Sequence, residues 1–202
     1  MKKQLSLLVF TSLFSMVVFA QTYEITPSYG YQFGTRFDYG IGYIKAEPSG
    51  QWGISAGAEL QPGMVVKLSY VSMATEGTIR DIDINNGNES RFTDLQNDWF
   101  LLGVQKYLKD GKVKPFVGGG LGLLVVSPKN EATLECTGCL PRREITPNLS
   151  SNTYFAFNFE AGVNIMLTDV IGINVQGNLY VPVNYGGFYF GTGGIGVTTG
   201  SS

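Results

Sequence analysis

The feature that most constrains the fold is an alternation of apolar and polar side chains along runs of about ten residues. In one run, Phe155, Phe157 and Phe159 alternate with Asn158 and Glu160. Successive side chains of a β-strand point to opposite faces, so such a run forms a strand with one apolar and one polar face. None of the runs stays apolar on both faces for the length of a membrane-spanning helix. The pattern therefore predicts strands rather than helices.

Eight runs of this kind follow one another, and the connections between them alternate in length. The expected strands are residues 23–35, 52–61, 64–79, 91–108, 113–126, 153–167, 170–181 and 188–199. Very short connections contain Pro62-Gly63, Asp110-Gly111 and Thr168-Asp169. The other connections are longer, and residues 127–152 form the longest. Short turns at one end and long loops at the other are typical of outer membrane barrels, in which the short turns are periplasmic.

An apolar face on every strand needs lipid around the outside of the sheet. We therefore expect an all-β fold, an eight-stranded antiparallel up-and-down transmembrane β-barrel that forms one domain, residues 21–202. A soluble periplasmic ligand-binding barrel, with its apolar face turned inward, is an alternative. Residues 1–20 begin with a basic Lys2-Lys3 pair, continue with an apolar stretch and end in a small residue, which predicts a cleaved secretory signal peptide. The expected location is the outer membrane of a Gram-negative bacterium.

Two segments add a family resemblance to this pattern. One is Lys114-Pro115-Phe116-Val117-Gly118-Gly119-Gly120-Leu121-Gly122, and the other is the hairpin from Gly162-Val163-Asn164-Ile165 to Val170-Ile171-Gly172-Ile173. Together with the eight-strand pattern they resemble the small OmpA/OmpX-like outer membrane β-barrel family, in the form found in Bacteroidota. The resemblance covers the whole chain after the predicted signal peptide. It implies the barrel fold and says little about function.

The sequence contains no histidine. Outer membrane barrel enzymes such as lipid A deacylases, palmitoyltransferases, omptin proteases and the outer membrane phospholipase resemble one another in needing a histidine as a base or to activate a nucleophile. We therefore expect no enzymatic activity, and no residue pattern points to a catalytic residue, a cofactor or a metal ion. The sequence has fourteen Lys and Arg residues and sixteen Asp and Glu residues, and the basic residues form no dense block. We therefore expect no nucleic-acid partner.

Polar and charged side chains occupy the inward positions of the expected strands. They are Glu24, Glu59, Lys67, Gln105, Lys114, Glu160, Asn164, Asn174, Gln176 and Asn178. These groups could line a permeation path or plug the interior with hydrogen bonds, and a plug is favoured because about eight strands leave a lumen that side chains can fill. Buried charges need partners. Because Glu59 and Lys67 flank the Pro62-Gly63 turn, we expect them to lie close together.

Cys136 and Cys139 lie in the longest connection and are separated by two residues. Such a pair can be a redox motif or half of a zinc site, but the chain has no second pair of ligands. In an oxidising compartment, we expect a local disulfide between them.

Aromatic residues near the strand ends are expected to form girdles at the membrane interfaces. They are Tyr29, Tyr31, Trp52, Tyr70, Trp99, Tyr107, Tyr180, Phe188, Tyr189 and Phe190. The last strand instead carries Gly191, Gly193, Gly194 and Gly196. Small residues there favour either tight closure on the first strand or a smooth wall against which another membrane protein packs.

The expected function is therefore structural or interactive, through the loops or the lipid-facing wall of the barrel. An accessory subunit of a larger outer membrane complex, for secretion or barrel assembly, would be one form of it. The expected partners are outer membrane lipid and other outer membrane proteins. A narrow pore for small solutes and the soluble ligand-binding barrel are the alternative functions.

Overall fold

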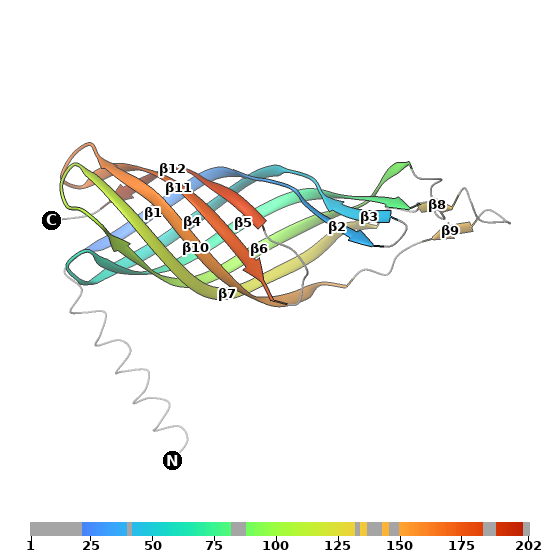
Figure 1. Cartoon of the computed structure of the whole chain (residues 1–202), viewed down its shortest axis with the longest axis horizontal. Coiled ribbons are helices and arrows are strands. Elements are labelled where there is room, and N and C mark those ends of the chain that lie inside the picture. The colour runs from blue at the N-terminus through green and yellow to red at the C-terminus, as the bar shows by residue number, and fades with distance from the viewer. Residues whose placement is uncertain are drawn as a thin grey trace, which may run out of the picture.

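Residues 22–39, 42–81, 88–131, 134–136, 143–145, 150–183 and 189–199 are described in this computed structural model. The predicted signal peptide, residues 1–20, lies outside these ranges. Within them, no helix is long and apolar enough to cross a membrane. The described residues form β-strands joined by turns (Figure 1).

Eight strands form a closed antiparallel barrel (Figure 1). They are β1 (Tyr23–Gln32), β4 (Ser49–Gln61), β5 (Met64–Asp81), β6 (Glu89–Tyr107), β7 (Val113–Glu131), β10 (Asn152–Met166), β11 (Ile171–Pro182) and β12 (Tyr189–Thr199). Around the barrel the order is β5-β4-β1-β12-β11-β10-β7-β6, and β6 pairs with β5 to close the ring. The predicted all-β, eight-stranded antiparallel barrel is confirmed.

Three short turns lie at one end of the barrel. They join β4 to β5, β6 to β7 and β10 to β11, and β1 begins and β12 ends at the same end (Figure 1). Gly63 in the first turn has φ +71° and Gly111 in the second has φ +121°, a backbone region that favours glycine. The strand ends that the longer connections join lie at the opposite end, as the alternation of connection lengths predicted (Figure 1).

The strands point their apolar side chains outward. Leu68 on β5 is 62% exposed, and Phe159 on β10 is also exposed, whereas Trp99 and Asn164 at inward positions are buried. A sheet with this facing needs lipid on its outside. The soluble alternative required the apolar face to turn inward, and the structure has the opposite arrangement.

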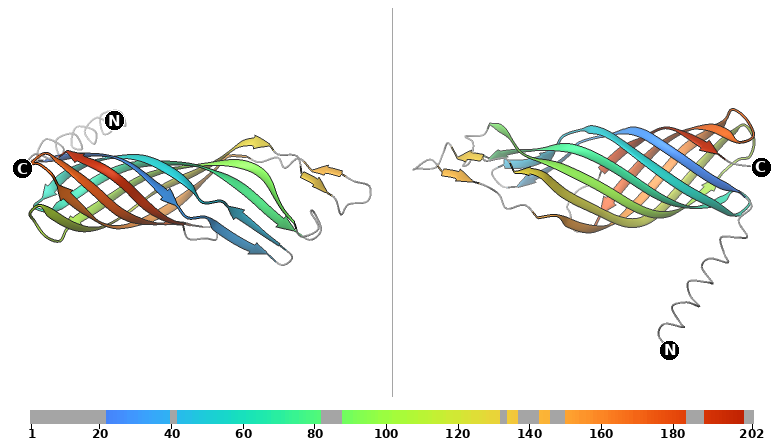
Figure 2. Two further views of the ribbon diagram at one scale, coloured as in Figure 1. Left: turned by 90° about the horizontal axis from the view of Figure 1, so that it is seen from above. Right: turned by 180° about the vertical axis from the view of Figure 1, so that it is seen from behind.

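Four further strands lie beyond the barrel, at the end with the longer connections (Figure 2). They are β2 (Thr35–Tyr39), β3 (Gly42–Ala46), β8 (Leu134–Cys136) and β9 (Arg143–Ile145). β3 pairs with residues 77–81 of β5, the part farthest from the short turns, and β2 pairs with β3. We expected residues 36–50 and 127–152 to be long connections. Both contain short strands of three to five residues, which are too short for the alternation to predict, and β7 extends to Glu131.

Candidate functional site

A buried ion pair lies in the lumen. The Nζ of Lys67 on β5 is 2.6 Å from Oε1 of Glu160 on β10 and 3.2 Å from Oε1 of Gln105. The side chains of Lys67 and Glu160 are 11% and 5% exposed. β5 and β10 are not neighbours in the sheet, so the pair crosses the lumen.

Glycines on the neighbouring strands make room for this pair. Lys67 lies opposite Gly57 on β4 and Gly103 on β6. Glu160 lies opposite Gly118 on β7, where an added Cβ would be 2.7 Å from its Oε1. A glycine directly across from a charged inward residue is therefore the sequence signal of the ion pair.

Lys67 does not pair with Glu59 as we expected. In the β4–β5 ladder, Lys67 lies opposite Gly57, whereas Glu59 lies opposite Val65, two residues nearer the turn. Glu59 instead accepts a hydrogen bond from the backbone N–H of Gly63, at 2.6 Å, and so closes the turn. The two charges therefore lie two positions apart along the ladder and have different partners.

A second polar cluster lies nearer the short turns and joins four strands. The hydroxyl of Tyr107 donates to Oε1 of Glu24 at 2.8 Å, and Nδ2 of Asn164 donates to the Tyr107 oxygen at 2.6 Å. Asn174 donates to Oδ1 of Asn164. The Nζ of Lys114 lies 5.8 Å from the centre of the Tyr107 ring. These contacts tie together β1, β6, β10 and β11 across the lumen.

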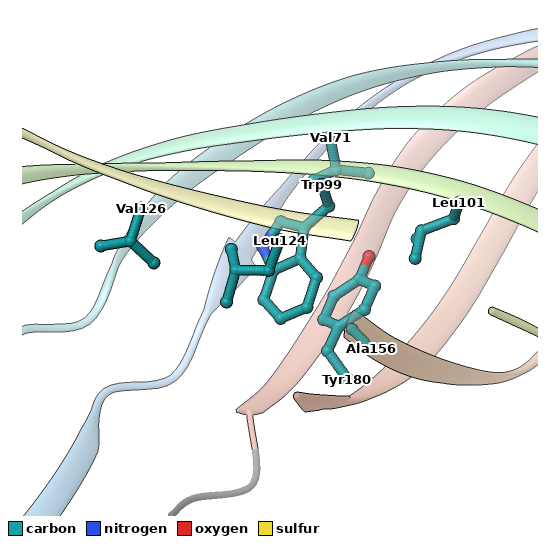
Figure 3. Close-up of a cluster of buried hydrophobic side chains, with 7 residues drawn as sticks. All are labelled: Val71, Trp99, Leu101, Leu124, Val126, Ala156 and Tyr180. Atoms are coloured by element: carbon teal, nitrogen blue, oxygen red, sulfur yellow. The ribbon is translucent and has the colours of Figure 1, made fainter. Parts of the chain in front are cut away.

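An apolar cluster fills the lumen toward the longer connections (Figure 3). Trp99 and Tyr180 stack with their ring centres 4.6 Å apart, and they are 0% and 1% exposed. Leu101, Leu124 and Val126 are buried around them. We expected Trp99, Tyr107 and Tyr180 in the interfacial girdles, which was wrong because they occupy inward positions of their strands, next to lipid-facing residues such as Phe100.

The clusters leave little space between them. One cavity of about 20 Å³ is lined by Asn158, Glu160, Gln176 and Asn178, among others, and a second of about 10 Å³ is lined by Glu24, Lys67, Gln105, Asn174 and Gln176, among others. Volumes of this size hold single water molecules. At these two places, the described side chains of the lumen therefore leave room for single waters.

The outer surface carries an aromatic row across three strands. Trp52 and Tyr70 lie with ring centres 5.4 Å apart, and Tyr70 and Phe100 lie 5.1 Å apart. Tyr29 and Tyr31 on β1 are also exposed. Phe188 lies outside the described residues, and for Tyr189 and Phe190 only the backbone is described. The row marks a membrane interface, because amphipathic rings collect at the headgroups.

Beyond this row the outer face becomes polar. The Tyr70 hydroxyl donates to Asp98 at 2.9 Å, and farther along the strands Arg91 lies 2.9 Å from Glu76. On the β2–β3 hairpin, Lys45 lies 2.8 Å from Glu47, and the hydrogen bond from Glu47 raises the pKa of the Lys45 ammonium. Charged pairs thus replace apolar side chains where the sheet leaves the membrane.

The remaining predicted residues lie outside these clusters. Cys136 ends β8 and Cys139 lies outside the described residues, so the disulfide stays a prediction. The glycines Gly191, Gly193, Gly194 and Gly196 belong to β12, which pairs with β11 on one side and β1 on the other. In the described part of the chain, no three His, Cys, Asp or Glu side chains come together as a metal site.

One family and several solved structures match the chain. The family described as "Outer membrane protein beta-barrel domain" matches residues 6–200. No curated protein matches significantly in sequence. Neisserial surface protein A has a TM-score of 0.58 at 14% identity, with 88% of this chain and 96% of that chain covered.

Two structures from Pseudomonas aeruginosa match similarly. The outer membrane protein OprG has a TM-score of 0.58 at 14% identity, and the match covers 90% of this chain and 94% of that chain. The N-terminal β-barrel domain of OprF has a TM-score of 0.54 at 14% identity, with 89% and 98% covered. Likeness at this level of identity concerns the fold alone.

Proposed function

The chain belongs to the outer membrane protein β-barrel domain family, and we propose that it is a non-enzymatic barrel with a closed lumen that acts through protein contacts on its outside. It would reside in the outer membrane of a Gram-negative bacterium after removal of residues 1–20. Surrounding lipid contacts its apolar face. An accessory subunit of a secretion or barrel-assembly complex is the form of this role that we favour.

The filled lumen is the observation that carries this proposal. The Lys67–Glu160 pair and the Trp99–Tyr180 stack both cross the interior. The cavities between them are of the size of single waters, so they favour a plug over a path for solutes. A chain without histidine also lacks the residue that barrel enzymes of the kinds considered above need. The outer surfaces of the barrel are then the parts that can carry its function, through contacts with other proteins.

Two outer surfaces can take a partner. The first is the sheet beyond the membrane, formed by β2, β3 and the upper parts of β5, β6 and β7 (Figure 2). β5 has 18 residues, whereas a membrane strand needs about 9–11, so roughly half of it extends outside the lipid. The second is the wall of β12. Gly191, Gly193 and Gly196 lie opposite the inward residues Asn178, Gln176 and Asn174, which leaves Gly194 as the glycine of this group that can face outward and allow close approach.

Co-purification from the native membrane in mild detergent tests the proposal and separates the two surfaces. One variant lacks the β2–β3 hairpin, residues 35–46, and another carries Gly194→Leu. Gly177→Leu is the matched control, because Gly177 on the neighbouring strand β11 has open space around an added Cβ. Loss of a stoichiometric partner in the first variant alone would identify the outer sheet, and loss in the second alone would identify the wall. Purification of the unaltered protein as a lone barrel would contradict the partner role.

A further inference from the structure

The ladder between β1 and β12 is incomplete in its middle. Ile25 pairs with Thr199, and the pairing resumes at Tyr31, which pairs with Thr192. The register shifts between these two pairs. Along residues 26–30, β1 has no ladder pair with the described strand β12. On its other side, the same strand pairs with β4 at all ten of its residues.

The direction of each backbone group on β1 follows from one hydrogen bond. The carbonyl of Thr22 accepts from the N–H of Glu59, so Thr22 faces the β4 side. In an antiparallel pair the residues alternate between their two neighbours. Even-numbered residues of β1 therefore direct their backbone groups to β4, and odd-numbered residues direct theirs to β12. The missing pairs thus concern Pro27 and Tyr29.

Pro27 reduces the number of groups that need a partner, because proline has no N–H. What remains on this side is the carbonyl of Pro27 and the N–H and carbonyl of Tyr29. On the outside the Tyr29 side chain is 69% exposed on the lipid-facing surface, and lipid tails offer no hydrogen bonds. Water that reaches these groups must therefore come from inside the barrel.

The cavity of about 20 Å³ lies behind this seam. Ser28 of β1 lines it, and so do Gln176 and Asn178 of β11, the strand on the other side of β12. Asn158 also lines the cavity, is 7% exposed, and its Oδ1 has no hydrogen-bond partner within the protein. A polar cavity of this volume with an unsatisfied acceptor has the properties of a buried water site.

We propose that ordered water occupies this cavity, donates to Oδ1 of Asn158 and hydrates the backbone of the β1–β12 seam at Pro27 and Tyr29 from the inside. The water takes the place of the missing ladder bonds. The seam is then the part of the barrel wall whose backbone exchanges with interior water.

Nuclear magnetic resonance of the full-length folded protein in detergent micelles tests this. The Tyr29 amide should exchange with solvent several-fold faster than the amide of Ser28, the adjacent residue that faces β4, and than that of Tyr31, which has a ladder pair with Thr192. The side-chain amide protons of Asn158 should show cross-peaks with water. Equal exchange at Tyr29 and Ser28, or an Asn158 side chain without a water cross-peak, would overturn the proposal.

A matched pair of substitutions locates the water. Ser28→Leu should fill the cavity and remove the water cross-peak of Asn158, whereas Ser28→Ala should keep it. Retention of the cross-peak in Ser28→Leu would contradict the assigned site. If Ser28→Leu does not fold, the amide exchange and the Asn158 cross-peak of the unaltered protein and of Ser28→Ala test the proposal.

Discussion

The Nζ of Lys67 lies 2.6 Å from Oε1 of Glu160, and this contact joins two strands that have no ladder between them. Both charges are withdrawn from water, which costs free energy unless each satisfies the other. Gly57, Gly103 and Gly118 lie across the ladders from the two residues and leave space for their side chains. The pair therefore crosses the lumen between layers of hydrogen-bonded and apolar side chains.

Breaking this pair from one side should destabilise the barrel strongly. Lys67→Met leaves the Glu160 carboxylate buried without its cation, and we expect a loss of about 3–5 kcal/mol in the free energy of unfolding. The double variant Lys67→Met/Glu160→Leu removes both charges and should be more stable than the single variant. Urea unfolding in lipid vesicles measures both. A double variant that is no more stable than Lys67→Met would contradict the assigned pairing.

The membrane boundary on β5 lies between Leu68 and Ala74, both of which are exposed. Leu68→Arg places a charge in the apolar band and should cost up to about 2–4 kcal/mol, the range for the bilayer midplane. Ala74→Arg lies beyond the aromatic row, in the polar part of the same face, and should cost much less. Unfolding in vesicles of defined thickness compares them. Equal costs would place Ala74 in the lipid as well.

Gly122 is needed for close approach of β7 to β6. An added Cβ would clash with the backbone oxygen of Phe100, whereas at Gly177 it would meet nothing within 4 Å. Gly122→Ala should therefore destabilise the barrel by about 1–3 kcal/mol or more, as overpacking does. Gly177→Ala should leave its stability nearly unchanged. The two unfolding midpoints test this, and a tolerated Gly122→Ala would show that the strands can separate.

Cys136 and Cys139 are expected to be oxidised in the exported protein. Its mass should then be lower than that of the reduced protein by two hydrogens, and an alkylating reagent should add nothing before reduction. Intact mass spectrometry of protein purified from the outer membrane measures this. Alkylation of both thiols without prior reduction would show that the predicted disulfide does not form.

The alternation of side chains predicted the fold well because it is a local property. Phe157 and Asn158 fall on opposite faces of their strand whatever the rest of the barrel does, and the eight-stranded antiparallel architecture follows from repeating that pattern. The family resemblance is confirmed by the match over residues 6–200. Turn residues such as Pro62 and Gly63 placed the short connections correctly.

The interior partners could not be predicted in the same way. Lys67 meets Glu160 because the three ladders β5–β6, β6–β7 and β7–β10 together fix the positions of the two residues across the lumen. The registers of three ladders cannot be predicted from the alternation within single strands. Trp99 and Tyr180 were assigned to the girdles by residue type, although the alternation on their own strands already directs them inward. Their neighbours Phe100 and Leu179 occupy the opposite, outward positions.

Current recordings in planar lipid bilayers test the closed lumen most directly. The unaltered full-length protein, inserted and folded, should give no steady single-channel current, because the Lys67–Glu160 pair and the Trp99–Tyr180 stack occupy the interior. Steady single-channel currents from the unaltered protein would contradict the closed lumen and would favour the narrow pore.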